Sequence, residues 1–133
     1  MDFGSSAGED GAVALTVSTR IGPGCAIVAV SGDVDISTSP DLREALAEAV
    51  AAGNRAIVVD MSAVRFVDST GLGVLVGAYT AVRNAGGRLS VVNDHAAVLK
   101  VLAITALHDV LGVHPTLAQA IAAVSEPLPA TES

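Results

Sequence analysis

A serine beside a carboxylate, followed by two glycines, is the group of residues in this chain best suited to chemistry. The segment DSTGLG, residues 68–73, places Ser69 just before a predicted helix. A hydroxyl there faces the free N–H groups and the positive end of the helix dipole, where an added phosphate could be accommodated without unfolding the domain. Gly71 and Gly73 would let another backbone approach closely. The spacing therefore predicts an accessible, modifiable hydroxyl at Ser69.

A second acidic segment, GDVDIST, carries Asp33 and Asp35 directly after the apolar stretch CAIVAV. The DSTGLG segment in turn follows a second apolar stretch, AIVVD. If these two stretches are parallel strands of one sheet, both loops emerge at the same edge of that sheet. We therefore expect Asp33 and Asp35 to be neighbours of Asp68 and Ser69.

Each of these residues also has a purely structural interpretation. A serine before a helix is more often a plain N-cap, although capping alone does not call for two glycines. Asp68 could be a local turn residue, and Asp33 and Asp35 could be solvated loop acids. Spacing alone leaves both interpretations open.

The elements that position these loops can be predicted from turns, caps and apolar periodicity. AVALTVSTR, the turn IGPG and CAIVAVSGD predict a hairpin whose second strand is the more buried. A helix then opens at Ser39, the candidate N-cap, with Pro40 at its first position, and Gly53 ends it. RAIVVDMS is the next strand, and the intervening helix forms a crossover that makes this strand parallel to CAIVAV.

The pattern of strand and helix then repeats to the end of the chain. A helix over about 70–85 is followed by the strand RLSVVN, a helix capped by Asp94, and HDVLGV as a weak last strand. Thr116 and Gln119 form a capping box before a last helix. The residues expected to face the core are Leu42, Leu46, Ala49 and Val50, then Leu72, Leu75, Val76, Tyr79 and Val82, then Val98, Leu99, Leu102 and Ala103.

The order β β α β α β α β α predicts a single α/β domain with one mixed sheet of about five strands and helices packed on it. With 133 residues, 51% of them hydrophobic, the chain is sized for one core. We expect the domain to span 12–126, with flexible tails at 1–11 and 127–133, because both ends are rich in small, acidic or proline residues.

Composition disfavours several classes of partner. A net charge of −7 would repel phosphate backbones and anionic lipid, and 2% aromatic residues leave little for base stacking. We expect no direct nucleic-acid or membrane binding and, without a signal segment or membrane span, a cytoplasmic location. Cys25 is the only cysteine, which excludes an internal disulfide. Its place on an apolar strand predicts burial, and a redox role stays open.

The segment VVDMSAVRFVDSTGLGVLVGAYTAVRNAGGRLSVVN resembles the central stretch of a STAS-domain anti-sigma factor antagonist. The resemblance extends upstream to GDVDISTSPDLREAL and covers roughly residues 13–125 in the expected order of elements. DSTGLG in that context is a specific motif. Ser69 occupies the family's phosphoacceptor position and Asp35 matches its acidic position in the upstream loop. Partner-contact roles are implied for Asp33, Asp35, Asp68, Thr70, Gly71, Leu72 and Gly73.

The resemblance implies a regulator of bacterial transcription that switches partners. In this family the unphosphorylated antagonist binds an anti-sigma factor that is also a serine kinase, and so frees a sigma factor. Phosphorylation of the serine breaks the complex, and a PP2C-type phosphatase restores it. The chain would then be a substrate and not an enzyme, with no cofactor or metal of its own, because ATP is bound by the partner kinase.

Three other interpretations remain. A receiver-like domain would use Asp60 as acceptor, but Lys100, the only lysine, lies inside a helical pattern. A hydrolase would pair Ser69 with His95, His108 or His114, but GxSxG is missing. A STAS-type scaffold or sensor module would keep the fold and leave Ser69 unmodified.

Overall fold

The computed structural model describes residues 15–125, so the expected tails at 1–11 and 127–133 lie outside the described residues. Five strands form one sheet in the order β1-β2-β3-β4-β5. Their bounds are β1 Thr16–Gly22, β2 Cys25–Ser31, β3 Ala56–Ala63, β4 Arg88–Val92 and β5 Val113–His114. The first pair is antiparallel and the others are parallel, which confirms the predicted mixed sheet.

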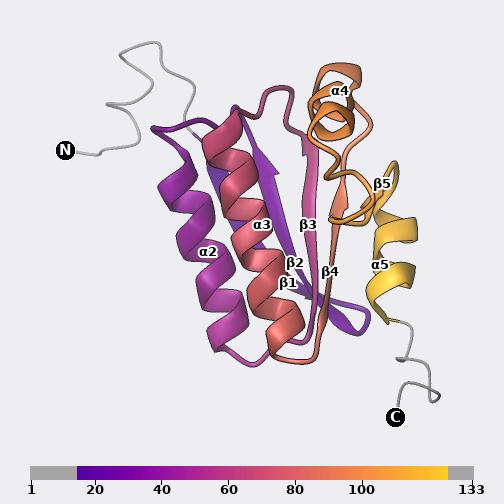
Figure 1. Cartoon of the computed structure of the whole chain (residues 1–133). Helices are drawn as coiled ribbons and strands as arrows, with labels where there is room; N and C mark the ends of the chain where they lie inside the picture. The colour runs from indigo at the N-terminus through magenta and orange to yellow at the C-terminus, as the bar shows by residue number, and fades with distance from the viewer. Residues whose placement is uncertain (1–14, 126–133) are drawn as a thin grey trace.

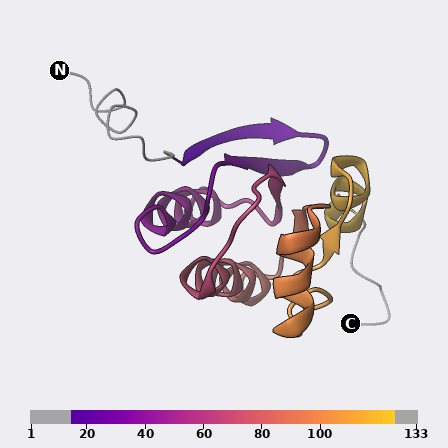
Figure 2. The same cartoon turned by 90° about the horizontal axis from the view of Figure 1, so that it is seen from above.

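Helices cover both faces of this sheet. α2 (Ser39–Ala51) and α3 (Ser69–Asn84) lie side by side on one face, and α5 (Leu117–Ser125) packs on the other (Figures 1 and 2). α4 (Ala96–Ile104) sits near the end where β4 finishes, the same end at which α3 begins (Figure 1). No helix within 15–125 has the length and apolar character needed to cross a membrane.

The hairpin and the crossover helix follow from the sequence as predicted. β1 and β2 pair from Thr16 with Ser31 to Gly22 with Cys25, and β2 is much more buried than β1. Burial raises the pKa of the Cys25 thiol, with Arg20 opposing the shift, so this cysteine is the buried residue that was expected. α2 ends before Gly53, which has a φ of 90° that a glycine adopts without strain.

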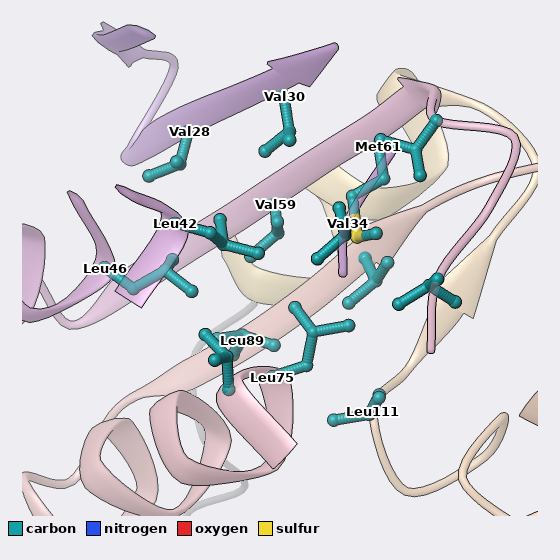
Figure 3. Packing of buried hydrophobic residues seen from close by; sticks show 14 of the residues in the cluster. Val28, Val30, Val34, Leu42, Leu46, Val59, Met61, Leu75, Leu89 and Leu111 are labelled. Carbon is teal, nitrogen blue, oxygen red and sulfur yellow. The ribbon is translucent and has the colours of Figure 1, made fainter. Parts of the chain in front are cut away.

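The main core lies between the sheet and the pair α2 and α3. Val28 and Val59 of the sheet meet Leu42 and Leu46 of α2 in the packing shown in Figure 3, and Leu75 of α3 approaches the same cluster. A smaller cluster beneath α5 contains Cys25, Ile27, Val58, Val92, Ala120 and Val124. The sheet is thus fixed from both sides, which holds its strand ends in place.

Two predicted caps are wrong by one residue. α2 has Thr38 as its N-cap and Ser39 as its first residue, 2% exposed, so Pro40 is second. The carboxylate of Asp35 accepts the N–H of Thr38, and this bond makes the turn that precedes the helix. α4 has His95 instead of Asp94 at its N-cap. The side chain of Asn93, the residue after β4, accepts the N–H of His95 and so fixes the backbone there.

Five residues expected to face the core are not fully buried, although three of them, Val50, Tyr79 and Leu99, still pack against it. Val76 and Tyr79 of α3 are only partly buried, whereas Val74 is 4% exposed, because α3 packs against α2 as well as the sheet and turns Val74 inward. Ala103 of α4 is exposed, because the helix turns the face that carries Val98 and Leu102 toward the core. The predicted strand HDVLGV shrinks to Val113–His114. Thr116 does cap α5, accepting the N–H of Gln119 at 3.2 Å.

The observed orientation of α3 predicts that Leu75 and Val76 contribute unequally to stability. Leu75 is 1% exposed, so Leu75→Ala should lower the free energy of unfolding by about 2–5 kcal/mol. Val76→Ala should cost only about 1 kcal/mol, because Val76 keeps part of its surface in water. Urea unfolding of both variants checks this, and equal losses would contradict the orientation of α3.

Candidate functional site

Two loops are joined side by side at the edge where β2 and β3 end. The loop after β2 and the loop before α3 form an isolated parallel bridge between Val34 and Val67. The N–H of Val34 donates to the carbonyl of Phe66 at 2.9 Å, and the N–H of Asp68 donates to the carbonyl of Val34 at 3.1 Å. The expected meeting of the two acidic segments is therefore found, and it is made by backbone hydrogen bonds.

Asp68, and not Ser69, is the N-cap of α3. The Asp68 carboxylate accepts the N–H of Gly71 at 3.0 Å, and the Asp68 carbonyl accepts the N–H of Leu72. Ser69 is the first residue of the helix and is exposed. The plain N-cap interpretation of Ser69 is therefore wrong. Within residues 15–125 its hydroxyl takes part in none of the hydrogen bonds, so modification there would break none of them.

The start of α3 is also electrostatically suited to an anion. The first residues of a helix have N–H groups without an intrahelical acceptor, and the helix dipole is positive there. Asp68 satisfies the N–H of Gly71, which leaves the amides of Ser69 and Thr70 at the surface end of the helix. A phosphate on Ser69 would lie close to these groups without displacing the cap.

The carboxylate of Asp35 stabilises the turn of its own loop. One of its carboxylate oxygens accepts hydrogen bonds from the Ser37 hydroxyl at 2.8 Å and from the N–H groups of Ser37 and Thr38 at 2.9 and 3.1 Å. The Ser37 hydroxyl is the largest cause of a lowered pKa at Asp35, and those N–H groups add to it. The other carboxylate oxygen makes no such bond within the described residues and can face a partner.

Asp33 and Thr70 are half-buried neighbours of these residues. Asp33 contributes its carbonyl, which accepts the Thr38 hydroxyl at 2.8 Å, while its carboxylate makes no hydrogen bond within 15–125. Asp33 precedes Val34 in the bridged loop, and Thr70 follows Ser69 in α3. Both lie where the sequence predicted, at the joined ends of the two loops.

The residues after Thr70 divide into packing and surface positions. A Cβ on Gly71 would lie 2.6 Å from Val34 Cγ1 and 2.7 Å from Val67 Cγ2, so the absence of a side chain lets α3 rest directly on the bridge. Leu72 is 6% exposed and faces the core. Gly73 has nothing within 4 Å of its Cβ direction and is open to a partner. Of these three expected contacts, only Gly73 presents itself at the surface.

Two exposed apolar side chains at this edge were missed from sequence. Ile36 is 74% exposed and Phe66 is 49% exposed, and each lies on one of the two joined loops. In the sequence each of them stands close to an apolar residue that is buried, Val34 for Ile36 and Val67 for Phe66, so no local signal separates the exposed residues from the buried ones. We call the surface formed by Asp33, Asp35, Ile36, Phe66, Asp68, Ser69 and Gly73 the loop edge. It combines apolar and acidic side chains around one free hydroxyl.

Comparison with known proteins agrees with this architecture. The family model of the STAS domain matches residues 16–120. The chain belongs to the STAS-domain family of anti-sigma factor antagonists. It is 33% identical over 86 residues to the anti-sigma-B factor antagonist of Bacillus subtilis, a match covering 65% of this chain and 78% of that protein.

Solved structures of antagonists have the same fold. An anti-sigma factor antagonist from Mycobacterium paratuberculosis superposes with a TM-score of 0.79 at 33% identity, covering 85% of this chain and 96% of the other. The unphosphorylated form of the antagonist SpoIIAA gives a TM-score of 0.70 at 20% identity, over 86% of this chain and all of SpoIIAA, which shows the shared fold alone. The resemblance seen in the sequence is thus confirmed.

Within residues 15–125, no salt bridge joins Asp60 to Lys100, as a receiver-like site would need. Asp60 is half-buried within β3, where its carboxylate accepts the N–H of Ser62, and Lys100 is exposed on α4. Within 15–125, no hydrogen bond joins Ser69 to a histidine, and no three metal-ligating side chains of the His, Cys, Asp and Glu types gather. The geometry supports neither an Asp60 phosphoacceptor nor a serine hydrolase.

Adding one methyl group at Gly71 or at Gly73 should change the stability of the domain in opposite directions. Gly71→Ala should destabilise the domain by roughly 1–3 kcal/mol, because the buried, β-branched Val34 and Val67 cannot move aside freely. Gly73→Ala should stabilise it by roughly 0.5–1 kcal/mol, since alanine favours an open helical position. Urea unfolding of the pair measures both, and a neutral Gly71→Ala would contradict the close contact.

The lowered pKa of Asp35 predicts a pH-dependent contribution to stability. The ionised carboxylate holds the Ser37 and Thr38 turn, so its contribution is present above the pKa of the unfolded chain and is lost as the pH falls through the lowered pKa of the folded state. The difference in urea midpoint between wild type and Asp35→Asn should therefore be largest near neutrality and shrink in acid. Asp33→Asn removes the same charge from the same loop and is the matched control: its urea midpoint near neutrality should stay close to that of wild type, because the Asp33 carboxylate makes no hydrogen bond within 15–125.

Proposed function

We propose that this STAS domain is the partner-switching antagonist of an anti-sigma factor in the cytosol of a bacterium, and that Ser69 is its switch. The unphosphorylated chain binds an anti-sigma factor that is also a serine kinase and so frees a sigma factor. Phosphorylation of Ser69 ends this binding, and a PP2C-type phosphatase reverses the modification. The observation that carries the proposal is the exposed Ser69 hydroxyl at the start of α3, with Asp68 acting as the cap in its place.

The loop edge has the composition of a docking surface. Ile36 and Phe66 supply apolar area that gains free energy when a partner covers it. The carboxylates of Asp35 and Asp68 lie beside them, and the whole chain carries a net charge of −7. A partner surface with apolar pockets and basic side chains would complement this edge. Support also comes from the relatives described above, which are named as antagonists of anti-sigma factors.

Phosphorylation would change the charge of this surface and leave the fold intact. A phosphoserine adds about −1.5 to −2 charges at neutral pH. At Ser69 that charge would stand beside Asp68 and would bring a strongly hydrated group into a contact that is otherwise partly apolar. A penalty of roughly 3 kcal/mol corresponds to more than a hundredfold loss of affinity, so one modification suffices to exchange partners. The Bacillus protein SpoIIAA has been solved in a phosphorylated form.

The chain acts as a substrate in this reaction. The Ser69 hydroxyl oxygen attacks the γ-phosphorus of ATP, the bond from that phosphorus to the bridging oxygen breaks, and ADP leaves. The hydroxyl proton goes to a base of the kinase, which also holds ATP and magnesium. In the reverse step, water attacks the phosphorus and the serine leaves as its hydroxyl, with inorganic phosphate as the second product.

Ser69 variants test the proposal in a pull-down from the source organism. Ser69→Ala should capture an anti-sigma factor, and Ser69→Asp should bind it at least tenfold more weakly, because the carboxylate imitates part of the phosphate charge. The captured protein, purified and supplied with ATP and magnesium, should add one phosphoryl group to wild type at Ser69, located by mass spectrometry of peptides.

Gln119→Glu is the matched control for charge. It adds one negative charge in the first turn of α5, on the opposite face of the sheet, where the helix dipole favours an acid. It should bind as wild type does. Equal binding by Ser69→Asp and Ser69→Ala, or a phosphoryl group at another residue, would overturn the assignment of Ser69 and favour a scaffold or sensor module.

A further inference from the structure

One buried amide side chain connects the end of β4 to the loop that leads to Ser69. Asn93 follows β4 directly, is 1% exposed and is one of three buried polar residues among those described. β4 runs parallel to β3, so Asn93 lies at the edge of the sheet where the loop edge also begins. Burial of an amide is costly unless its polar atoms are hydrogen-bonded.

The Asn93 side chain makes three hydrogen bonds, two as donor and one as acceptor. The Nδ2 group donates to the carbonyl of Met61 at 2.8 Å and to the carbonyl of Val64 at 3.0 Å. The Oδ1 atom accepts the N–H of His95 at 2.8 Å. Only this orientation of the amide faces its two donors to carbonyls and its acceptor to an N–H group. The side chain therefore joins the turn at the end of β3 to the start of α4.

The two carbonyls belong to the turn that starts the β3–α3 loop. The N–H of Val64 donates to the carbonyl of Met61 at 2.9 Å, which closes this turn, and Val64 itself is fully buried. The chain then passes through exposed Phe66 to Val67, where the bridge to Val34 fixes it again. Asn93 holds the loop at its beginning and the bridge holds it at its end, two residues before Ser69.

We infer that Asn93 is a positioning residue for the switch: it fixes the β3–α3 loop so that Phe66 and Ser69 are presented to a partner in one arrangement. The role in recognition rests on the proposed function, whereas the restraint on the loop does not. Aspartate lacks the two donors, and serine or threonine has only one, so none of these residues could replace both hydrogen bonds that Asn93 donates to the turn.

Hydrogen exchange tests the restraint without any partner. In Asn93→Ala the carbonyl of Val64 loses its Asn93 donor and that of Met61 keeps only the N–H of Val64, so amides of residues 62–68 should exchange about tenfold faster or more than in wild type. Asn93→Ser, with one donor left, should give a smaller increase and keeps the test valid should Asn93→Ala not fold. Unchanged exchange in this loop would overturn the inference.

Ser90→Ala is the matched control. Ser90 is likewise 1% exposed, and its hydroxyl donates to the carbonyl of Ala120 in α5 at 2.9 Å, on the other face of the sheet. It should lower the urea midpoint without selectively accelerating exchange in 62–68. A selective acceleration of the same size in Ser90→Ala would show general loosening and would count against a specific role of Asn93.

Binding to the captured anti-sigma factor then tests the role in recognition. We expect Asn93→Ala to bind about tenfold more weakly than wild type, and Ser90→Ala to bind as wild type does at a temperature where both are folded. Faster exchange with unchanged affinity would restrict Asn93 to a structural role and overturn positioning. Absence of any partner for wild type would refute the proposed function, while the exchange result would still decide whether Asn93 restrains the loop.

Discussion

The backbone bridge between Val34 and Val67 is the contact on which the candidate site depends. It continues the parallel pairing of β2 and β3 beyond the ends of those strands and brings two acidic loops together. Gly71 lets α3 settle on the two bridged valines, so the start of the helix is positioned by the same contact. Any larger residue at Gly71 would separate the helix from the bridge, and Ser69 would move with it.

The site separates the residue that can change from the residues that hold the fold. Asp68 caps α3 and Asp35 fixes the turn before α2, and each uses one carboxylate oxygen to do so. Among the described residues, 15–125, the Ser69 hydroxyl makes no hydrogen bond of this kind. A modification at Ser69 can therefore alter the charge of the surface by a large amount while the free energy of unfolding changes little, which is what a reversible switch between partners requires.

Much of this arrangement could be predicted from the sequence, because it depends on local signals. Turn residues marked the hairpin, a helix between two apolar strands fixed their parallel direction, and that direction placed Asp33 and Asp35 near Asp68 and Ser69. The family motif gave Ser69 its role as a predicted phosphoacceptor. These inferences need no knowledge of which side chains meet across the core.

The errors arose where distant residues decide the outcome. Packing of α3 against α2 buries Val74 and exposes part of Val76, and no periodicity within α3 contains that information. The N-cap of α4 is His95 and not the predicted Asp94, because the Asn93 side chain accepts the N–H of His95. In the sequence, Asn93 looked like an ordinary strand end. Ile36 and Phe66 lie in turn-like segments, where exposure is decided by how two loops meet.

A loop held at both ends also determines how strongly one phosphate can act. A flexible loop could move Ser69 away from the interface after modification and so lose part of the electrostatic penalty. Here Asn93 fixes the beginning of the loop and the Val34–Val67 bridge fixes its end, so under the proposed function a phosphate on Ser69 would stay at the loop edge. The same restraint lowers the entropy cost of binding for the unmodified form. In the proposed switch, a rigid loop would increase affinity in the unmodified state and repulsion in the phosphorylated state, and so widen the difference in affinity between the two states.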